Sequence, residues 1–296
     1  MTANSQNKTD TITNQSLAHA SSHYENFPVA SILLPQHLRE PIGLIYSFAR
    51  QADDFADEGD LTIQERLDLL NGFREELSLL QAYIKPQTAF FETLGAMIRA
   101  KKLPFELFYN LLDAFSQDVT KTRYQNYAEV LDYCRRSANP IGRLLLHLYH
   151  EATAHNLQLA DHICSALQII NFLQDIAIDF QKNDGKQRIY MCQDELAQFR
   201  LSEQDIAAFI AGKSIDKRWQ SFMQYNLTRV EQQLQSGKQL GSILKGRIGL
   251  EMRMIIAGGE RIIAKIRKVD GDIFQHRPTL NKLDWFRMLL KAIFRR

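Results

Sequence analysis

The sequence predicts an all-α fold, and three observations lead to this prediction. Its 296 residues contain only 14 Gly and 7 Pro, so few positions interrupt regular structure. Long stretches rich in Leu, Ala, Gln, Glu and Arg favour helix. No run shows the alternation of a strand, and no hairpin turn signal appears. A chain of this length can bury one large core, which either one domain or two closely packed halves would satisfy.

The helices are expected at regular intervals along the chain. The first should cover residues 42–58, because Pro41 suits the first helical position and Gly59 suits the position after the end. Helical patterns follow at about 61–82, 87–101, 104–119, 126–137, 141–153 and 158–181. Gly185 interrupts the pattern, and a polar loop is expected through Tyr190. Later helices are expected at about 193–198, 203–211, 216–237, 241–269 and 280–295.

The rest of the composition narrows the class of protein. Residues 1–20 are rich in Ser, Thr, Asn and Gln without an apolar stretch, so a disordered tail is expected there instead of a signal peptide. No run of about 18 apolar residues predicts a membrane-spanning helix. Cys134, Cys164 and Cys192 lack metal-ligand spacing and suit a reducing cytoplasm. Basic residues are spread evenly without interleaved aromatic residues, which argues against a nucleic-acid-binding module.

The first candidate site is an acidic motif in the expected helix 42–58. Asp53 and Asp57 are separated by four residues, so both carboxylates should point in the same direction, with Arg50 one turn earlier. Like charges at this spacing destabilise an isolated helix by a few tenths of a kcal/mol. A hard divalent cation such as Mg²⁺, which takes carboxylate and phosphate oxygens, would offset that cost.

The second candidate site lies in the expected helix 158–181. Gln168, Asn171, Asp175 and Asp179 follow one another at spacings of 3, 4 and 4, which places them on one face. The other faces are apolar, so this helix should be buried. Two acids on a buried helix are costly unless they line a cavity that holds ions. Each acid pair has an alternative interpretation as a solvated helix face, and Asp53 with Asp57 fits that alternative better than Asp175 with Asp179.

These segments resemble the signatures of the squalene/phytoene synthase family. Tyr46-Ser-Phe-Ala-Arg50 with Asp53-Asp54-x-x-Asp57 is similar to the first signature, and Tyr133-Cys134 through Gly142 to a central segment. Gln168-x-x-Asn171-x-x-x-Asp175-x-x-x-Asp179, followed by Arg188-Ile189-Tyr190, is similar to the second. The resemblance extends from about His23 to Arg277.

The resemblance implies a single isoprenoid synthase-like helical domain over residues 21–296, built around a central active-site cavity. It implies Mg²⁺ as cofactor, with Asp53, Asp57, Asp175 and Asp179 as metal ligands and catalytic residues. It also implies a prenyl diphosphate bound by the following residues: Tyr46, Arg50, His23, Asn26, Phe27, Tyr133, Asn139, Gln168, Asn171, Arg188 and Tyr190. Lys182 is a further candidate phosphate contact, and Phe48 and Phe172 are candidate cavity aromatics.

Within the family, the closest resemblance is to members of bacterial hopanoid pathways that convert presqualene diphosphate and water to an alcohol. The segments 23–31, 135–143 and 284–285 carry it. Neighbouring pathway enzymes are then candidate partners. Ser137-Ala-Asn-Pro-Ile-Gly142 and Gly271 depart from the pattern of members that condense two prenyl diphosphates. Asn139 is therefore a candidate for holding water, or it simply begins the next helix.

Two alternatives to this function remain open. One is a condensing synthase that joins two prenyl diphosphates to squalene, dehydrosqualene or phytoene. The other is a noncatalytic helical scaffold, which intact acidic motifs argue against.

The segment 283–296 is amphipathic and basic. Arg287, Lys291 and Arg295 share one face, and apolar residues cover the other. This pattern fits contact with an anionic membrane surface at the periphery of the inner membrane, or a terminal helix packed on the body of the protein.

Overall fold

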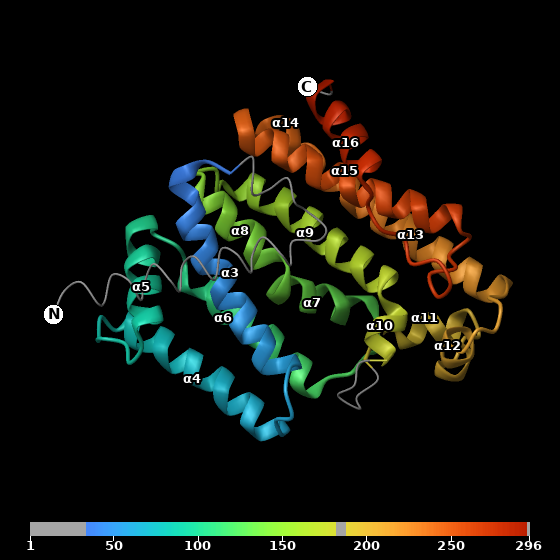
Figure 1. Cartoon of the computed structure of the whole chain (residues 1–296), viewed down its shortest axis with the longest axis horizontal. Helices are drawn as coiled ribbons and strands as arrows, with labels where there is room; N and C mark the ends of the chain where they lie inside the picture. The colour runs from blue at the N-terminus through green and yellow to red at the C-terminus, as the bar shows by residue number, and fades with distance from the viewer. Residues whose placement is uncertain (1–33, 182–187, 295–296) are drawn as a thin grey trace. The chain divides into compact units, whose positions relative to one another are not determined.

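The computed structural model describes residues 34–181 and 188–294. These residues are mostly helical, which confirms the predicted all-α class, and the one ladder they contain has two short strands (Figure 1). The chain forms two compact units, one of residues up to Thr120 together with Arg143–Ala152, the other of Lys121–Gly142 and Thr153 onward. The boundary falls within α8 (Asn139–Leu148). A single domain over 21–296 stays a prediction.

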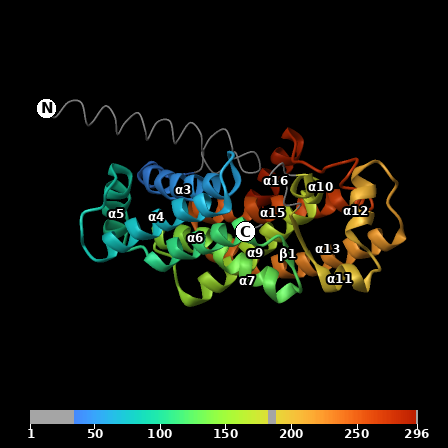
Figure 2. The same ribbon diagram turned by 90° about the horizontal axis from the view of Figure 1, so that it is seen from below.

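The first unit is built from helices that surround an aromatic core. These are α3 (Gln36–Asp57), α4 (Ile63–Gln81), α5 (Ala89–Lys101) and α6 (Phe105–Thr120). Helix α3 packs against α4, α5 and α6, and Figure 2 shows it beside α4 and α6. Phe48 is fully buried, with its ring centroid 5.5 Å from Phe73, 6.1 Å from Phe91 and 5.3 Å from Phe108. Phe48 is therefore a core residue of this unit.

Helix α3 begins six residues earlier than the sequence predicts. Its N-cap is Pro35, and Pro41 lies inside the helix, buried, instead of at its first position. Proline is tolerated near the start of a helix, where the cost of its missing N–H is smallest. The predicted end is confirmed, because Glu58 is the C-cap and Gly59 follows with a φ of +74°.

A buried arginine fixes the end of α3. Arg66 of α4 is 5% exposed and donates hydrogen bonds to four backbone carbonyl groups. The distances are 3.1 Å to Phe55, 2.9 Å to Glu58, 2.6 Å to Gly59 and 3.2 Å to Leu61. Helix C-termini leave carbonyl groups without intrahelical donors, and this guanidinium supplies them. The turn that carries Asp57 is therefore tied to α4.

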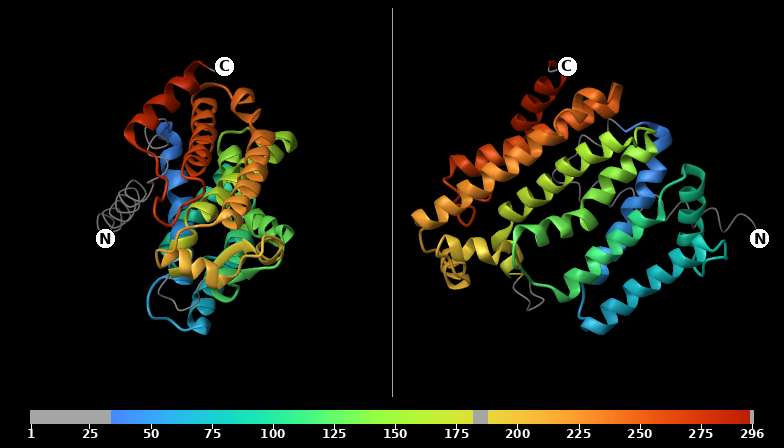
Figure 3. Two further views of the ribbon diagram at one scale, coloured as in Figure 1. Left: turned by 90° about the vertical axis from the view of Figure 1, so that its right-hand side faces the viewer. Right: turned by 180° about the vertical axis from the view of Figure 1, so that it is seen from behind.

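The second unit contains the remaining elements, and its long helices lie side by side. Helix α9 packs against α7, α13 and α15, and α15 packs against α16, an arrangement visible in Figures 1 and 3. The elements are α7 (Tyr127–Ser137), α9 (Ala154–Gln174), α10 (Ile176–Gln181), α11 (Gln193–Gln198), α12 (Glu203–Ile210), α13 (Lys217–Gly237), α14 (Leu240–Ile243), α15 (Gly246–Lys268), α16 (Lys282–Phe294), β1 (Arg123–Tyr124) and β2 (Ile189–Cys192).

A glycine permits the closest approach of α13 to α9. A Cβ atom on Gly237 would lie 2.5 Å from the Cγ1 atom of Ile163 and 2.6 Å from the carbonyl oxygen of Leu159. No other residue fits there without moving the α9 backbone. Most apolar residues of α9 are buried, as predicted, although Leu167 is partly exposed and Ile178 of α10 is 47% exposed.

Two helices predicted as continuous are interrupted. The predicted helix 158–181 begins at Ala154, where Thr153 is the N-cap, and it breaks at Asp175 into α9 and α10. The predicted helix 241–269 is divided by Leu244 and Lys245, with Gly246 at a φ of +67°. Apolar residues continue on both sides of each break, so hydrophobic periodicity alone does not reveal the breaks.

The predicted loop through Tyr190 is in part a strand. Ile189–Cys192 pairs in parallel with Arg123–Tyr124. The Ile189 N–H donates to the Thr122 carbonyl at 3.0 Å, and the Asp194 N–H donates to the Gln125 carbonyl at 3.1 Å. Strands this short carry no recognisable alternation, which explains why the sequence analysis missed them.

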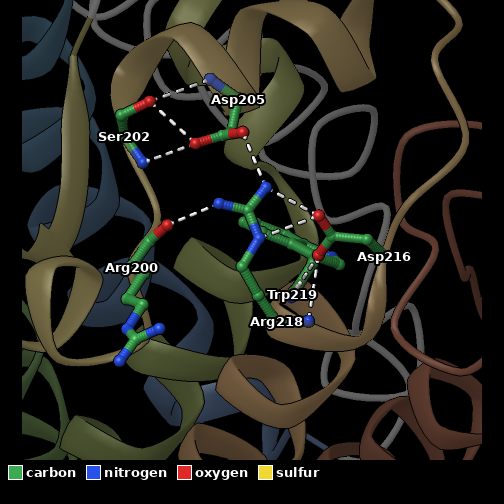
Figure 4. Close-up of polar contacts among 6 residues, drawn as sticks. All are labelled: Arg200, Ser202, Asp205, Asp216, Arg218 and Trp219. Carbon is green, nitrogen blue, oxygen red and sulfur yellow. Dashed lines mark hydrogen bonds and ion pairs between the residues drawn. The ribbon is translucent and has the colours of Figure 1, made fainter.

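The junction between α12 and α13 is held by a network of charged residues (Figure 4). Arg218 donates to Asp205 at 2.9 Å, to Asp216 at 2.6 Å and to the Arg200 carbonyl at 2.6 Å. Asp216 also caps α13 by accepting the Trp219 N–H at 3.1 Å. The fully buried Trp219 indole then donates to the Gly271 carbonyl at 2.9 Å. The network therefore reaches the segment after α15.

Candidate active site

The first acidic motif is a compact cluster on α3. Arg50 contacts Asp53 at 3.3 Å, Asp54 at 2.7 Å and Glu58 at 2.5 Å; Glu58 is exposed and the other three side chains are partly exposed. Asp53 and Asp57 lie on the uninterrupted helix one turn apart, as predicted. The arrangement presents several carboxylate oxygens around one guanidinium group, all within about two helical turns.

Tyr46 belongs to the same cluster. Burial raises the pKa of its phenol, Arg50 opposes that shift, and Asp54 and Asp53 add to it. Because the charges of Arg50, Asp53 and Asp54 all shift this pKa, the Tyr46 phenol lies close to them, one turn before Arg50. Tyr46 therefore stays protonated at neutral pH and is able to donate a hydrogen bond.

The second acidic motif lies at the junction of α9 and α10. Asp175 is the C-cap of α9, with φ −110° and ψ 14°. The Asp175 N–H still donates to the Asn171 carbonyl, and the Asp179 N–H to the Asp175 carbonyl, both at 2.9 Å. The one-turn spacing of Asn171, Asp175 and Asp179 therefore survives the break. Asp175 and Asp179 are partly exposed, Gln168 is partly buried and Asn171 is exposed.

The structure brings several predicted residues of the second unit into one aromatic cluster. Tyr190 stacks on Phe172 with 3.8 Å between centroids and 4° between planes. The Tyr133 ring lies 5.6 Å from Tyr190 and 5.8 Å from Phe172. Tyr124 also stacks on Tyr190, at 5.5 Å. All four rings are at most 7% exposed, so they pack against one another in the interior of this unit.

Arg188 is a buried charged residue beside this cluster. It is 2% exposed, and its Nη1 atom donates to the Tyr190 hydroxyl at 3.3 Å. Burying a guanidinium group is costly unless it is well paired, and a contact between Arg188 and phosphate stays a prediction.

Asn139 has a structural role in the second unit. It is 6% exposed and is the first residue of α8. Its Oδ1 atom accepts a hydrogen bond of 2.8 Å from the Ser165 hydroxyl of α9. Asn139 and Pro140 therefore begin the helix, and the Asn139 side chain joins it to α9.

Four predicted residues lie outside the described part of the chain. These are His23, Asn26, Phe27 and Lys182.

One group of potential metal ligands appears in the described ranges away from the acidic motifs. Cys192, Asp194 and Glu195 offer atoms within 4.8 Å of one another. Glu195 already forms an ion pair with Arg229, and burial raises the pKa of the Cys192 thiol to about 12, with Glu195 adding to the shift. Because the Glu195 carboxylate is already engaged by the Arg229 guanidinium, a structural role accounts for this group.

Three residues that shape the site were missed by the sequence analysis. Arg277 contacts Asp175 at 2.7 Å, Arg66 holds the end of α3, and Tyr124 joins the aromatic cluster. Arg277 and Asp175 are 102 positions apart, so spacing gives no signal for their contact. A lone arginine on a helix is ordinarily a surface residue, and Arg66 has no feature that distinguishes it.

Comparison with known proteins places the chain in a family. The model of the squalene/phytoene synthase family matches residues 20–284. This chain belongs to the squalene/phytoene synthase family, whose signatures the two acidic motifs resemble.

Particular relatives narrow the comparison. The chain is 34% identical to a hydroxysqualene synthase of Rhodopseudomonas palustris over 248 residues, which cover 83% of this chain and 80% of the relative. It is 26% identical over 260 residues to a phytoene synthase of Mycobacterium bovis, covering 87% of this chain and 82% of the relative. The crystal structure of the squalene synthase HpnC from Alicyclobacillus acidocaldarius is similar with a TM-score of 0.77 at 31% identity, covering 88% of this chain and 93% of that chain.

Proposed function

We propose that this protein is a hydroxysqualene synthase, an enzyme that converts presqualene diphosphate and water to hydroxysqualene and diphosphate. The observation that carries the proposal is the 34% identity to a curated hydroxysqualene synthase across four fifths of that relative's length. The phytoene synthase relative is less similar over a comparable length.

The reaction balances without a reductant. The bond from carbon to the diphosphate oxygen breaks, and its electron pair leaves with the diphosphate. The cyclopropylcarbinyl cation that remains rearranges, and a water oxygen forms the new carbon–oxygen bond. The proton lost from that water completes the balance. The enzyme therefore has to favour departure of diphosphate, shelter the cation, and admit one water molecule.

The aspartates of the two motifs are the proposed ligands of Mg²⁺. Asp53, Asp57, Asp175 and Asp179 fit this hard cation, because each motif offers partly exposed carboxylates one turn apart. Bound Mg²⁺ would supply positive charge for the developing charge of the leaving diphosphate. That the two acidic motifs face each other stays a prediction.

The other predicted residues are proposed to bind and orient the substrate. Arg50 and Arg188 are guanidinium donors suited to phosphate oxygens, and Tyr46 is a protonated phenol beside the first motif. Gln168 and Asn171 share the face of the second acid pair. Tyr133, Tyr190 and the rings stacked with them would attract the cation and exclude bulk water. His23, Asn26, Phe27 and Asn139 keep their proposed role by resemblance alone.

A peripheral contact with a membrane is also proposed, through α16. None of the helices in the described ranges has the length and apolar character needed to cross a bilayer. Leu283, Phe286, Leu290 and Ile293 are each at least 40% exposed and follow one stripe, with Arg287 and Lys291 exposed beside them. Apolar residues flanked by cations suit an anionic lipid interface. Phe286→Ser with Leu290→Ser should abolish co-sedimentation with anionic vesicles, and unchanged co-sedimentation would refute this contact.

The function is tested by offering two substrates separately in water enriched in ¹⁸O. With presqualene diphosphate, Mg²⁺ and no reductant, we expect hydroxysqualene that carries ¹⁸O in its hydroxyl group, detected by mass spectrometry. Farnesyl diphosphate alone should give little turnover. Rapid conversion of farnesyl diphosphate to a condensed hydrocarbon, without alcohol from presqualene diphosphate, would show that the protein is a condensing synthase.

A further inference from the structure

The second acidic motif is paired with a cation from a distant part of the chain. The Arg277 Nε atom donates to the Asp175 Oδ1 atom at 2.7 Å. The two side chains are 39% and 25% exposed, so the pair opens to solvent. Exposed ion pairs contribute little to stability. A contribution to folding therefore does not account for this contact by itself.

The backbone around Arg277 is held at several points, which leaves its side chain as the part able to move. The buried Gln174 amide, next to Asp175, donates to the Pro278 carbonyl at 2.5 Å. The Lys265 ammonium donates to the Thr279 carbonyl at 2.6 Å. On the other side, Trp219 donates to the Gly271 carbonyl at 2.9 Å. The guanidinium group is therefore delivered to Asp175 from an anchored segment.

The guanidinium also has donors to spare. Only its Nε atom is engaged with Asp175, and an arginine carries five N–H donors arranged to bind an anion with two parallel hydrogen bonds. A carboxylate that gains a divalent cation no longer needs an arginine beside it. The displaced guanidinium would then be close to any phosphate group that the cation attracts.

We propose that Arg277 is the resident counter-cation of Asp175, and that its guanidinium transfers to the substrate diphosphate when a divalent cation takes the Asp175 carboxylate. This inference rests on the proposed function, because it assumes that Asp175 is a metal ligand. It makes Arg277 a substrate-binding residue that also balances the charge of the second motif before substrate arrives.

Two effects of opposite sign follow. Without Arg277, the divalent cation no longer competes with a guanidinium for Asp175, so Mg²⁺ alone should bind more tightly. Diphosphate in the presence of Mg²⁺ loses a charge-assisted donor, so it should bind more weakly. A general loosening of the structure would weaken both.

The experiment is isothermal titration calorimetry of the full chain with two probes, MgCl₂ alone and inorganic diphosphate in excess Mg²⁺. For Arg277→Gln we expect Mg²⁺ affinity to rise about 2- to 5-fold. Diphosphate affinity should fall roughly 10- to 100-fold. Arg277→Lys, which keeps the charge and loses the planar fork, should lie between the wild type and Arg277→Gln for both probes. Arg247→Gln, an exposed arginine of the same unit, is the control and should change neither.

The outcomes separate this inference from the proposed function. If Arg277→Gln leaves both affinities unchanged, or lowers both, the inference about Arg277 is wrong. The companion variant Asp175→Asn tests the metal assignment and should abolish Mg²⁺-dependent binding of diphosphate, whereas the product analysis above tests the proposed function. If Asp175→Asn binds both probes as the wild type does, Asp175 is not a ligand, and the metal assignment and the Arg277 inference fail together.

Discussion

The two acidic motifs have the same spacing of aspartates but are held in different ways. On α3 the helix is continuous, and the cation that contacts the acids, Arg50, comes from one turn earlier on the same helix. At the junction of α9 and α10 the helix breaks at Asp175, and the cation, Arg277, comes from 102 positions away. The cation beside the first motif therefore comes from the same helix, whereas the position of the cation beside the second motif depends on the tertiary structure of its unit.

The spacing of the aspartates in the sequence and the charges around them are therefore separate properties of each motif. Both motifs keep their carboxylates one turn apart, because backbone hydrogen bonds preserve that spacing even across the break. The supporting groups differ, because a buried arginine binds the end of α3, whereas Gln174 at the end of α9 binds the segment that carries Arg277. Changes to local support should thus affect the first motif, and changes to the C-terminal segment should affect the second.

The largest expected effect comes from removing one carboxylate of either motif. Asp53→Asn and Asp175→Asn should each lower kcat/KM for presqualene diphosphate by roughly 10²- to 10³-fold, because each removes charge that stabilises the leaving diphosphate. Release of diphosphate measures this. If the motifs act on one diphosphate, the double variant should lose much less than the product of the two single losses.

The control for this pair is Asp60→Asn, an exposed acid in the loop after α3, which should keep full activity. If the loss of kcat/KM in the double variant equals the product of the two single losses, the two motifs act independently, and the proposal that they act on one diphosphate is wrong.

The next largest effect concerns the support of the first motif. Arg66→Ala leaves the partly buried carbonyl groups of Phe55, Glu58 and Gly59 without their donor, and should lower the free energy of unfolding by about 2 kcal/mol. Urea denaturation measures it. Arg74→Ala removes a partly exposed arginine of the same helix and should cost less than about 1 kcal/mol. Equal losses for the two variants would refute the special role of Arg66.

The smallest effect is a pH dependence that belongs to the second unit. Burial alone would raise the pKa of Asp284, but the Asn281 N–H, Lys265 and Arg261 lower it from 3.8 to about 2. The native state thus binds fewer protons than the unfolded state in this range. The contribution, on the order of 1–2 kcal/mol, is complete above about pH 4 and lost as pH falls towards 2.

Asp284→Asn should remove this part of the pH dependence of the free energy of unfolding, measured by urea denaturation from pH 6 to pH 2. Because Lys265 contacts both Asp284 and the Thr279 carbonyl, the variant should also disturb the segment that carries Arg277. If the free energy of unfolding depends on pH in the same way in Asp284→Asn and in the wild type, Asp284 is not the source of this pH dependence.

Most of the fold could be predicted because its signals are local. Helical periodicity and capping residues placed α4, α7, α11 and α13 within about two residues of their ends. The start of α3 was predicted wrongly because Pro41 was interpreted as a first-turn residue, and it lies inside the helix. The break at Asp175 and the short strand at Ile189 depend on tertiary contacts, which periodicity does not contain.

The sequence motifs of the site could be predicted, but the contacts between residues from separate elements could not. The resemblance named Tyr133, Arg188 and Tyr190 together, and the structure brings these residues into one cluster. Tyr124 and Arg277 reach the same region through the strand ladder and the anchored loop. No spacing rule connects residues from such separate elements, so only the structure could identify them.

The most direct test of the central claim is thermal unfolding with Mg²⁺ and inorganic diphosphate, added separately and together. We predict that the wild type gains far more Tm with both together than with either alone, and that Asp53→Asn and Asp175→Asn each abolish this extra gain while Asp60→Asn keeps it. A gain of full size in either motif variant would contradict the claim that both motifs hold the diphosphate through a divalent cation.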